Sequence, residues 1–322
     1  MNLLSWIVYI PVQILFLPVV IIGTMLVAYK QILVSKRLGI SMTAIEVING
    51  RWTMHFFGMR EDEATARLAA ALPNTSLLGL KLSLFPLWLK YRISGRQALY
   101  PRVPEPGAEA VLDLVVGRTL YFDSIIECAT EQVEQFVTLG AGYDTRAYGT
   151  LRDKSVSYFE LDQPSVQKHK RAMLSSAGID LDHVTFVEID FTKDKAMERL
   201  VEAGFDANKK TLFLWEGVTL YLSEAEVRAA MQDIRSTACA GSVLLADIYA
   251  SRFNAIAKKG ASKKTLDNAG EGLDFDLDFA NNHEKVLADF VESEGFAVGE
   301  THFMGRKNEK GPFVVVAEMR LD

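Results

Sequence analysis

The sequence TLGAGYDTR at residues 138–146 closes a short apolar run and opens a turn. Gly140 and Gly142 let the backbone pass close to a ligand, because neither has a side chain that blocks the approach. A helix that starts after the turn favours negative charge at its N-terminus, but Asp144 already places a carboxylate there. A dinucleotide site would have a third glycine to admit a pyrophosphate, where this chain has Thr145. The stretch therefore predicts a zwitterionic ligand with an amino group, and a structural glycine turn is the alternative.

Apolar, β-branched or aromatic runs alternate with helix-like segments around this turn. The runs lie at 136–139, 156–161, 184–189, 211–215 and 242–248, and the helix-like segments at 164–177, 193–203 and 224–238. Strands that alternate with helices predict an α/β fold with a doubly wound, mostly parallel sheet. Residues 296–304 and 313–319 flank a turn-rich stretch and predict a hairpin at the sheet edge, which brings the sheet to seven strands. The polar segment 258–278 predicts a mobile surface loop.

Acidic residues end three further predicted strands, and ligands of open α/β sheets lie at the carboxyl ends of strands. Either Glu160 or Asp162 would accept the hydroxyls of a ribose. Because both point the same way on a strand of period two, the residues alone do not choose between them. Asp190 would bind an adenine amino group beside the ring of Phe191, and Glu216 would bind an amino group or orient a substrate. Each acid also has an ordinary alternative as a helix cap or an exposed strand-end residue.

The N-terminal segment contains no charged residue between Asn2 and Tyr29. Roughly 20 apolar residues cross a bilayer core, so the run predicts a transmembrane helix over residues 1–30. A cleaved signal peptide would need a basic start and a small-residue cleavage site, and neither is present. The residues that follow the run are basic: Lys30, Lys36 and Arg37. Basic flanks stay in the cytoplasm, which predicts a single-pass protein with residues 31–322 on the cytoplasmic side.

A second apolar stretch covers residues 77–88, interrupted by Lys81 and Pro86. It predicts either a helix in the membrane interface or a helix that covers the ligand site. Residues 31–110 are accordingly expected to form a helical, membrane-proximal lid region, and residues 111–322 the ligand-binding domain.

Composition excludes several classes of function. A net charge of −6 and a pI near 5.5 argue against nucleic acid as a partner, because phosphate binding needs a basic face. Cys128 and Cys239 are too few for a disulfide framework and have no zinc spacing, so we expect no metal site. None of the five histidines stands in a decisive motif, and no general base is assigned: His55, His169, His183, His283 and His302.

Taken in order, the four motifs resemble the leucine carboxyl methyltransferase family, which also contains many bacterial O-methyltransferases. The segments that carry the resemblance are 139–146, 159–164, 190–191 and 216–221, and 118–123 looks like the family's Arg-Thr-x-x-Phe-Asp element. The likeness extends from Gly117 to the C-terminus, whereas residues 1–100 do not visibly match.

The resemblance implies a Rossmann-like methyltransferase fold that binds S-adenosyl-L-methionine under a helical N-terminal lid. The implied site residues are Arg118 for the cofactor's carboxylate, Gly140, Ala141, Gly142 and Asp144 for its methionine half, Glu160 or Asp162 for its ribose, Asp190 and Phe191 for its adenine, and Glu216 for its amino group and the reacting centre. Of the two ribose candidates the resemblance favours Asp162, and Glu216 is the one catalytic candidate.

A membrane anchor brings little advantage unless the methyl acceptor is in the membrane. The expected function is therefore S-adenosylmethionine-dependent O-methylation of a lipophilic small molecule, with membrane lipid as a further partner. Three alternatives stay open at this point. They are carboxyl methylation of a protein C-terminus, an NAD-dependent oxidoreductase, against which Thr145 argues, and a non-catalytic membrane scaffold, against which the complete set of motifs argues.

Overall fold

The computed structural model of the protein describes residues 3–97, 99–191, 193–257 and 272–322. The chain divides into two compact units. The smaller is made of residues 1–103 and 173–179, and the larger of residues 104–172 and 180–322.

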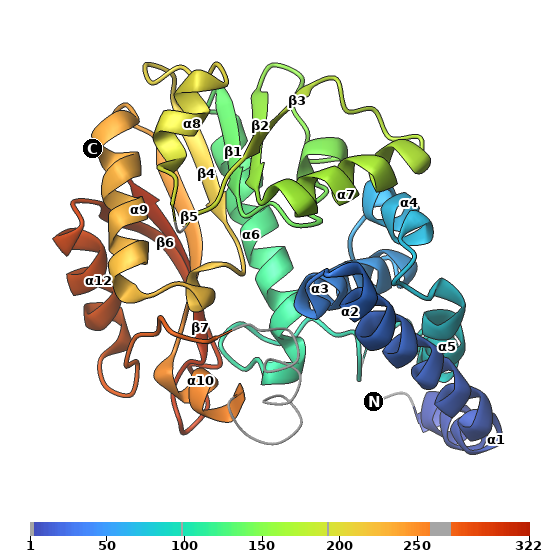
Figure 1. The fold of residues 1–322 in the computed structure, drawn as a ribbon. Helices are drawn as coiled ribbons and strands as arrows, with labels where there is room; N and C mark the ends of the chain where they lie inside the picture. Colours follow the sequence, from blue (N-terminus) through green and yellow to red (C-terminus); the bar gives the residue numbers. More distant parts are fainter. Residues whose placement is uncertain (1–2, 98, 192, 258–271) are drawn as a thin grey trace. The chain divides into compact units, whose positions relative to one another are not determined.

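Seven strands of the described residues form one sheet in the larger unit (Figure 1). They are β1 (Gln135–Leu139), β2 (Ser157–Asp162), β3 (Val184–Glu188), β4 (Thr211–Trp215), β5 (Val243–Tyr249), β6 (Ala297–Met304) and β7 (Val314–Arg320). Their order is β3-β2-β1-β4-β5-β7-β6; β1 to β5 are parallel, and β7 is antiparallel to both β5 and β6. The predicted doubly wound, mostly parallel sheet and its terminal hairpin are confirmed.

Helices cover both faces of this sheet. On one face α6 (Leu114–Thr130) packs through Phe122, Ile125 and Ile126. The other face is covered by α8 (Ala196–Glu202), α9 (Glu224–Thr237) and α12 (His283–Ser293). The segments predicted as helices at 164–177, 193–203 and 224–238 correspond to α7 (Pro164–Ser176), α8 and α9.

Local sequence explains where α9 begins. The hydroxyl of Ser223 accepts a bond from the Glu226 amide at 3.3 Å, and the Glu226 carboxylate accepts one from the Ser223 amide at 2.7 Å. This reciprocal pairing satisfies two amides that the first helical turn leaves without partners.

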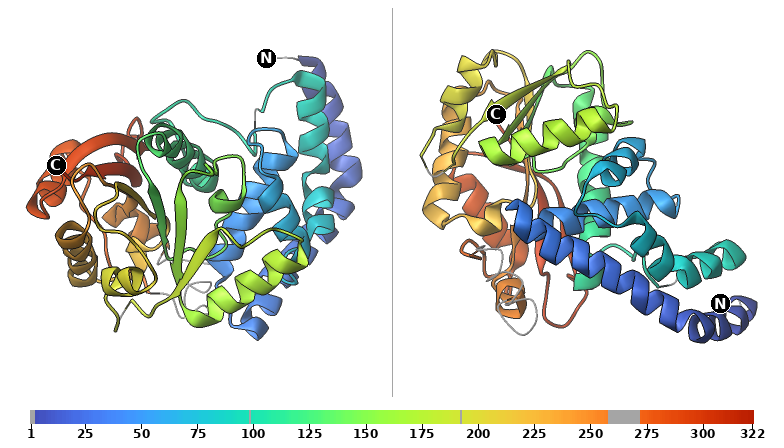
Figure 2. Two further views of the ribbon diagram at one scale, coloured as in Figure 1. Left: turned by 90° about the horizontal axis from the view of Figure 1, so that it is seen from above. Right: turned by 45° about the vertical axis from the view of Figure 1, so that its right-hand side comes forward.

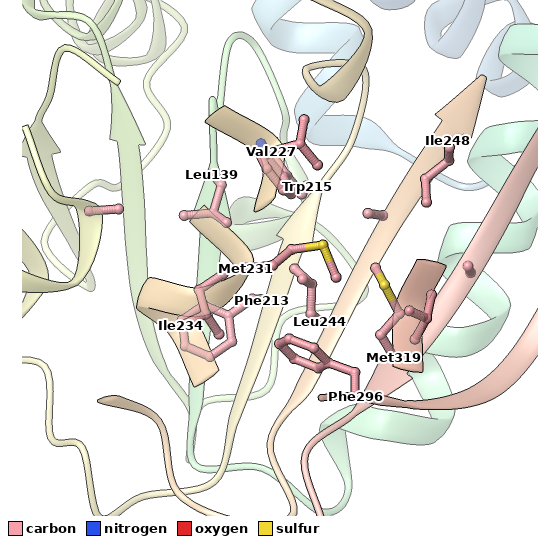
Figure 3. Close-up of a cluster of buried hydrophobic side chains, with 14 of the residues drawn as sticks. Leu139, Phe213, Trp215, Val227, Met231, Ile234, Leu244, Ile248, Phe296 and Met319 are labelled. Atoms are coloured by element: carbon pink, nitrogen blue, oxygen red, sulfur yellow. The ribbon is translucent and has the colours of Figure 1, made fainter. Parts of the chain in front are cut away.

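The largest buried cluster lies between the sheet and the α8, α9 and α12 layer (Figure 3). Phe213 and Trp215 of β4 and Leu244 of β5 point from the sheet toward Met231 and Ile234 of α9. Each such fully buried side chain contributes about 1.5–3 kcal/mol to folding. The cluster holds the strands in register and thereby fixes the positions of the residues that follow their carboxyl ends.

The prediction of a surface loop at 258–278 is wrong for the residues from 273 onward. Residues 258–271 lie outside the described residues. Leu273 and Phe275, by contrast, are 4% and 1% exposed. In the sequence LDFDLDF at 273–279 apolar and acidic residues alternate, so an extended backbone turns the apolar ones to one side. The acidic composition concealed this pattern.

The smaller unit is helical. Its helices are α1 (Leu3–Ala28), α2 (Ser35–Leu38), α3 (Met42–Phe56), α4 (Glu63–Ala71) and α5 (Leu77–Ser94), with the π-helical turn η1 (Tyr29–Val34) joining α1 to α2. Figure 2 shows α1 and α5 side by side, and these two helices make the most extensive contact within the unit.

One helical stretch of the described residues, Trp6–Leu38, is long and apolar enough to cross a membrane, with a mean hydropathy of 2.4. Only 6% of its most apolar window is buried inside the protein. This finding rests on length and composition, which a signal sequence would also satisfy.

Candidate functional site

The turn after β1 depends on its glycines. Gly140 and Gly142 have φ values of +67° and +44°, a region that residues with a Cβ adopt only at a cost. A Cβ at Gly140 would also lie 2.5 Å from a methyl carbon of Val218. The Ala141 amide donates to the Leu161 carbonyl at 2.9 Å, which ties the turn to the end of β2. The packing of the turn against Val218 thus requires a glycine at position 140.

Asp162 ends β2 and faces that turn. Its carboxylate accepts from the Gly142 amide at 2.6 Å and from the Gln163 amide at 2.7 Å. Burial raises the pKa of Asp162, and these two amide donors oppose the rise. The acid is therefore fixed beside the glycine turn.

Glu160 has a different environment. It is 2% exposed, and its carboxylate accepts a hydrogen bond from Lys170 at 2.6 Å, while Lys170 is itself buried. Burial raises the pKa of Glu160, which the Lys170 ammonium partly offsets. The carboxylate of Glu160 is thus engaged in an interior ion pair, and Asp162 is the one of the two acids that reaches the turn.

Asp190 and Phe191 follow β3 at the same edge of the sheet. The Ile189 amide donates to the Asp162 carbonyl at 3.0 Å, which joins the two strand ends. The Asp190 side chain is one-third exposed and pairs with Lys193 at 2.5 Å. Phe191 packs against the main core cluster while staying partly exposed. Both residues are thus partly exposed at this edge.

Arg118 projects from α6 toward the ends of β4 and β5. Its Nη1 donates to Asp247 at 2.8 Å and to the Tyr249 hydroxyl at 2.6 Å, and its Nε lies 3.2 Å from Glu216. Burial alone would lower the pKa of Arg118, but Tyr249, Glu216 and Asp247 hold it above its ordinary value. The guanidinium stays charged although it is 5% exposed.

Arg146 joins three of the motifs. Its Nε donates to Asp123 at 2.7 Å, and its Nη1 donates to Asp144 at 2.5 Å and to Glu216 at 2.6 Å. Asp123 belongs to the segment that includes Arg118, Asp144 to the glycine turn, and Glu216 to the end of β4. Arg146 is 2% exposed, and the three carboxylates outweigh burial and raise its pKa well above the ordinary value.

Together these side chains form one charge cluster, with two guanidinium groups facing four carboxylates: Arg118 and Arg146 with Asp123, Asp144, Glu216 and Asp247. Because charges interact more strongly where water is excluded, the excess of carboxylates favours a ligand that carries positive charge. The same excess opposes a diphosphate.

Sequence reasoning gave no role to three members of the cluster. Asp123 and Arg146 lie in motifs quoted for the resemblance, and Asp247 lies outside them. A signal for Asp247 was present, because it is the one acid in the otherwise apolar strand VLLADIY at 243–249. It is fully buried, accepts from the Gly217 amide at 2.9 Å, and has its pKa raised by burial.

His169 and His302 form hydrogen bonds with residues outside this charge cluster. His169 on α7 bonds through Nδ1 to the Tyr143 hydroxyl at 2.7 Å, and His302 on β6 bonds to Glu300 at 2.7 Å. Burial lowers the pKa of His169. Within the ranges that the structure describes, no group of three or more His, Cys, Asp or Glu residues is placed to hold a metal ion.

The chain resembles known proteins over the region that carries the site. Residues 89–235 match the model of a family described as leucine carboxyl methyltransferase. A protein of Mycobacterium avium named "Putative S-adenosyl-L-methionine-dependent methyltransferase" is 30% identical over 179 residues, which are 53% of this chain and 56% of that protein. A protein of the same name from Mycobacteroides abscessus is 30% identical over 195 residues, 59% of this chain and 63% of that one. The chain thus spans between about half and two-thirds of the length of these curated relatives.

A solved Thermobifida fusca protein described as a "putative methyltransferase" overlaps 80% of this chain and 94% of its own, with 16% identity and a TM-score of 0.48. The matched range 89–235 contains Arg118, the glycine turn, the ends of β2 and β3, and Glu216. Over these residues the chain is similar to the leucine carboxyl methyltransferase family.

Proposed function

We propose that this protein is a membrane-attached methyltransferase that uses S-adenosyl-L-methionine and methylates a lipophilic small molecule on oxygen. The match of residues 89–235 to a methyltransferase family supports methyl transfer as the reaction class. The observation that carries the cofactor class is the excess of carboxylates over guanidinium groups beside the glycine turn.

The residues present fit this cofactor. When bound, S-adenosyl-L-methionine supplies an electrophilic methyl group on a positively charged sulfonium and also carries an ammonium and a carboxylate group. Four carboxylates and two guanidinium groups offer partners for both ends of such a zwitterion. A Cβ at Gly142 would meet no atom nearer than 4.0 Å, so the backbone there is open to a ligand. An NAD-dependent oxidoreductase is disfavoured, because a diphosphate would meet the excess acids and the side chain of Thr145.

Each site residue is assigned one role in binding. Asp162 accepts the ribose hydroxyls, since a carboxylate keeps lone pairs beyond those that its two amide donors use. Asp190 and Phe191 hold the adenine by a hydrogen bond and by ring contact. Arg118 binds the cofactor carboxylate through its guanidinium group, which Asp247 and Tyr249 orient through Nη1.

Glu216 is assigned the role of orienting the cofactor. Its two oxygens face Arg118 and Arg146, so the carboxylate is fixed in place rather than free to take a proton. Methyl transfer is an in-line displacement whose rate depends on aligning the donor and the acceptor oxygen. A carboxylate held by two guanidinium groups serves that alignment by binding the cofactor's ammonium group.

The apolar, little-buried helix α1 supports a lipophilic acceptor. A helix this apolar and this little buried attaches the chain to a membrane, where a lipophilic acceptor is concentrated. Sites for such ligands are mostly apolar, with a few polar groups that fix orientation. Carboxyl methylation of a protein C-terminus is the second candidate, because the family is named for that reaction.

A methyl-transfer assay on membranes with labelled S-adenosyl-L-methionine tests the proposal. Label should enter the organic extract with the wild-type protein and with Arg199→Lys, an exposed control, but not with Asp162→Asn. Label confined to protein as a base-labile ester would establish the second candidate instead. No transfer to either fraction by protein that binds the cofactor would contradict the acceptor assignment.

A further inference from the structure

Helix α5 runs antiparallel to α1 and covers one side of α1 along most of the length of α1. At one end a Cβ on Gly23 would lie 2.7 Å from the Gly79 carbonyl, so the two backbones touch. In the middle the rings of Phe16 and Phe85 are 4.9 Å apart. At the other end the Lys90 ammonium sits 4.5 Å from the ring of Trp6. Lipid therefore has no access to this side of α1.

The far side of α5 is bound to the rest of the same unit. Trp88 stacks at 6.1 Å on Phe56 of α3, and Tyr91 lies 5.9 Å from Phe57. Helix α3 in turn buries polar groups such as Asn49 and Thr53. An upright α1 would carry this helical unit with it into the hydrocarbon.

The cations of α5 oppose an upright arrangement. Lys81 and Arg92 are both exposed and stand eleven residues apart, which is about 16 Å along a helix. A bilayer core is about 30 Å thick, so one of the two would lie deep in hydrocarbon, where charged side chains are costly. Both reach the headgroups if the helix pair lies in the plane of the membrane.

The opposite side of α1 is apolar and uncovered. Ile14, Leu15 and Met25 are 69%, 75% and 66% exposed. This outer face runs the length of the helix and ends at the exposed Lys36 and Arg37. Apolar area flanked by cations matches a bilayer surface that contains anionic phospholipid.

From this geometry we infer that α1 and α5 form a monotopic anchor. The outer face of α1 lies in the interfacial region of an anionic membrane, α5 backs it, and the N-terminus does not cross the bilayer. The inference rests on the proposed membrane attachment, but it replaces the single crossing predicted from the sequence. Cofactor binding by detergent-extracted protein is independent of it.

Side-specific labelling of the full chain in sealed inside-out vesicles tests this anchor. One reporter is the exposed Cys128, in a Cys239→Ser background. The other is a cysteine placed ahead of Met1, with Cys128 and Cys239 both replaced by serine. A membrane-impermeant maleimide should label both reporters equally. Labelling of Cys128 alone, with the N-terminal reporter labelled only after the vesicles are opened, would establish a transmembrane α1 and overturn the inference. Recovery of both proteins in the soluble fraction would overturn membrane attachment itself.

A packing variant tests why α1 stays in the plane. Gly79→Leu places a side chain against the Gly23 carbonyl, 2.8 Å from its Cβ, and separates α1 from α5. The freed α1 should then cross, and the N-terminal reporter should lose most of its labelling. The control is Leu78→Ala at an exposed neighbouring position, which should label as the parent does. Unchanged labelling of Gly79→Leu would show that α5 does not hold α1, which would contradict the inference.

Discussion

Nη1 of Arg146 lies 2.6 Å from the carboxylate of Glu216, so the residue that closes the glycine turn after β1 is bonded to the acid that follows β4. These residues are 70 positions apart in the sequence. The bond crosses the point where the strand order reverses, which is where open α/β sheets bind their ligands. Arg146 therefore keeps the two halves of the site at a fixed distance.

Replacing Arg146 with lysine should weaken the fold and the cofactor site together. One ammonium cannot reproduce the fork with which the guanidinium reaches Asp123, Asp144 and Glu216. Lysine keeps the positive charge but leaves part of the carboxylate cluster without a donor. The loss should therefore be smaller than the roughly 3–5 kcal/mol for removal of a whole partner, and should still lower the melting temperature by several degrees. Thermal unfolding and calorimetric cofactor titration measure both effects. Arg199→Lys at an exposed pair is the control, and equal melting temperatures for the two variants would refute the role of Arg146.

Replacing Gly140 with alanine should abolish most cofactor binding. The change combines a left-handed backbone, which costs a non-glycine residue roughly 1–3 kcal/mol, with a clash against Val218. Gly204→Ala is a matched control, since Gly204 has φ +96° with no atom within 4 Å of its Cβ. Calorimetric cofactor titration measures the loss of binding, and urea unfolding measures the loss of stability. Equal affinity and equal stability of Gly140→Ala and Gly204→Ala would contradict the prediction.

Neutralising Glu216 should discriminate between S-adenosyl-L-methionine and S-adenosyl-L-homocysteine. The sulfonium charge is present only in the first, and one charge several ångströms away is worth about 1 kcal/mol at intermediate dielectric. Glu216→Gln should thus weaken the methyl donor about five- to tenfold more than the product. Parallel calorimetric titrations give the ratio. An equal loss for both ligands would place the sulfonium away from this carboxylate.

His169 should make stability depend on pH below neutrality. Burial holds its pKa below 6.5, so just under pH 6.5 the unfolded chain binds more protons than the folded protein. Stability therefore falls as the pH drops through that window, and Nδ1 of the protonated ring can only donate to the Tyr143 hydroxyl. His169→Gln should flatten the melting temperature between pH 7.5 and pH 5. An unchanged slope would assign the pH dependence to other groups.

Much of the fold is readable from the sequence because the strands are short and nearly wholly apolar. The predicted run 211–215 coincides with β4, and the other runs differ from their strands by one residue at one or both ends. Strand ends then place Asp162, Asp190 and Glu216 at one edge of the sheet, since parallel strands share that edge. The acidic alternation at 273–279 was misread, because its periodicity is short and its composition suggests solvent exposure.

The finer features of the site depend on tertiary contacts. Glu160 and Asp162 have the same sequence signature, and only the position of Lys170 on α7 separates them. Arg146 and Asp247 acquire their importance from partners 70 and 129 residues away. The pairing of α1 with α5 depends on two glycines 56 positions apart, Gly23 and Gly79, whose proximity no local pattern indicates.

The most direct test of the central claim is equilibrium binding of the cofactor to the detergent-extracted full chain. Calorimetry with S-adenosyl-L-methionine, S-adenosyl-L-homocysteine and NAD should show one saturable site for the first two and none for NAD. Asp162→Asn should weaken the binding of both. Saturable binding of NAD without binding of either methyltransferase ligand would contradict the account.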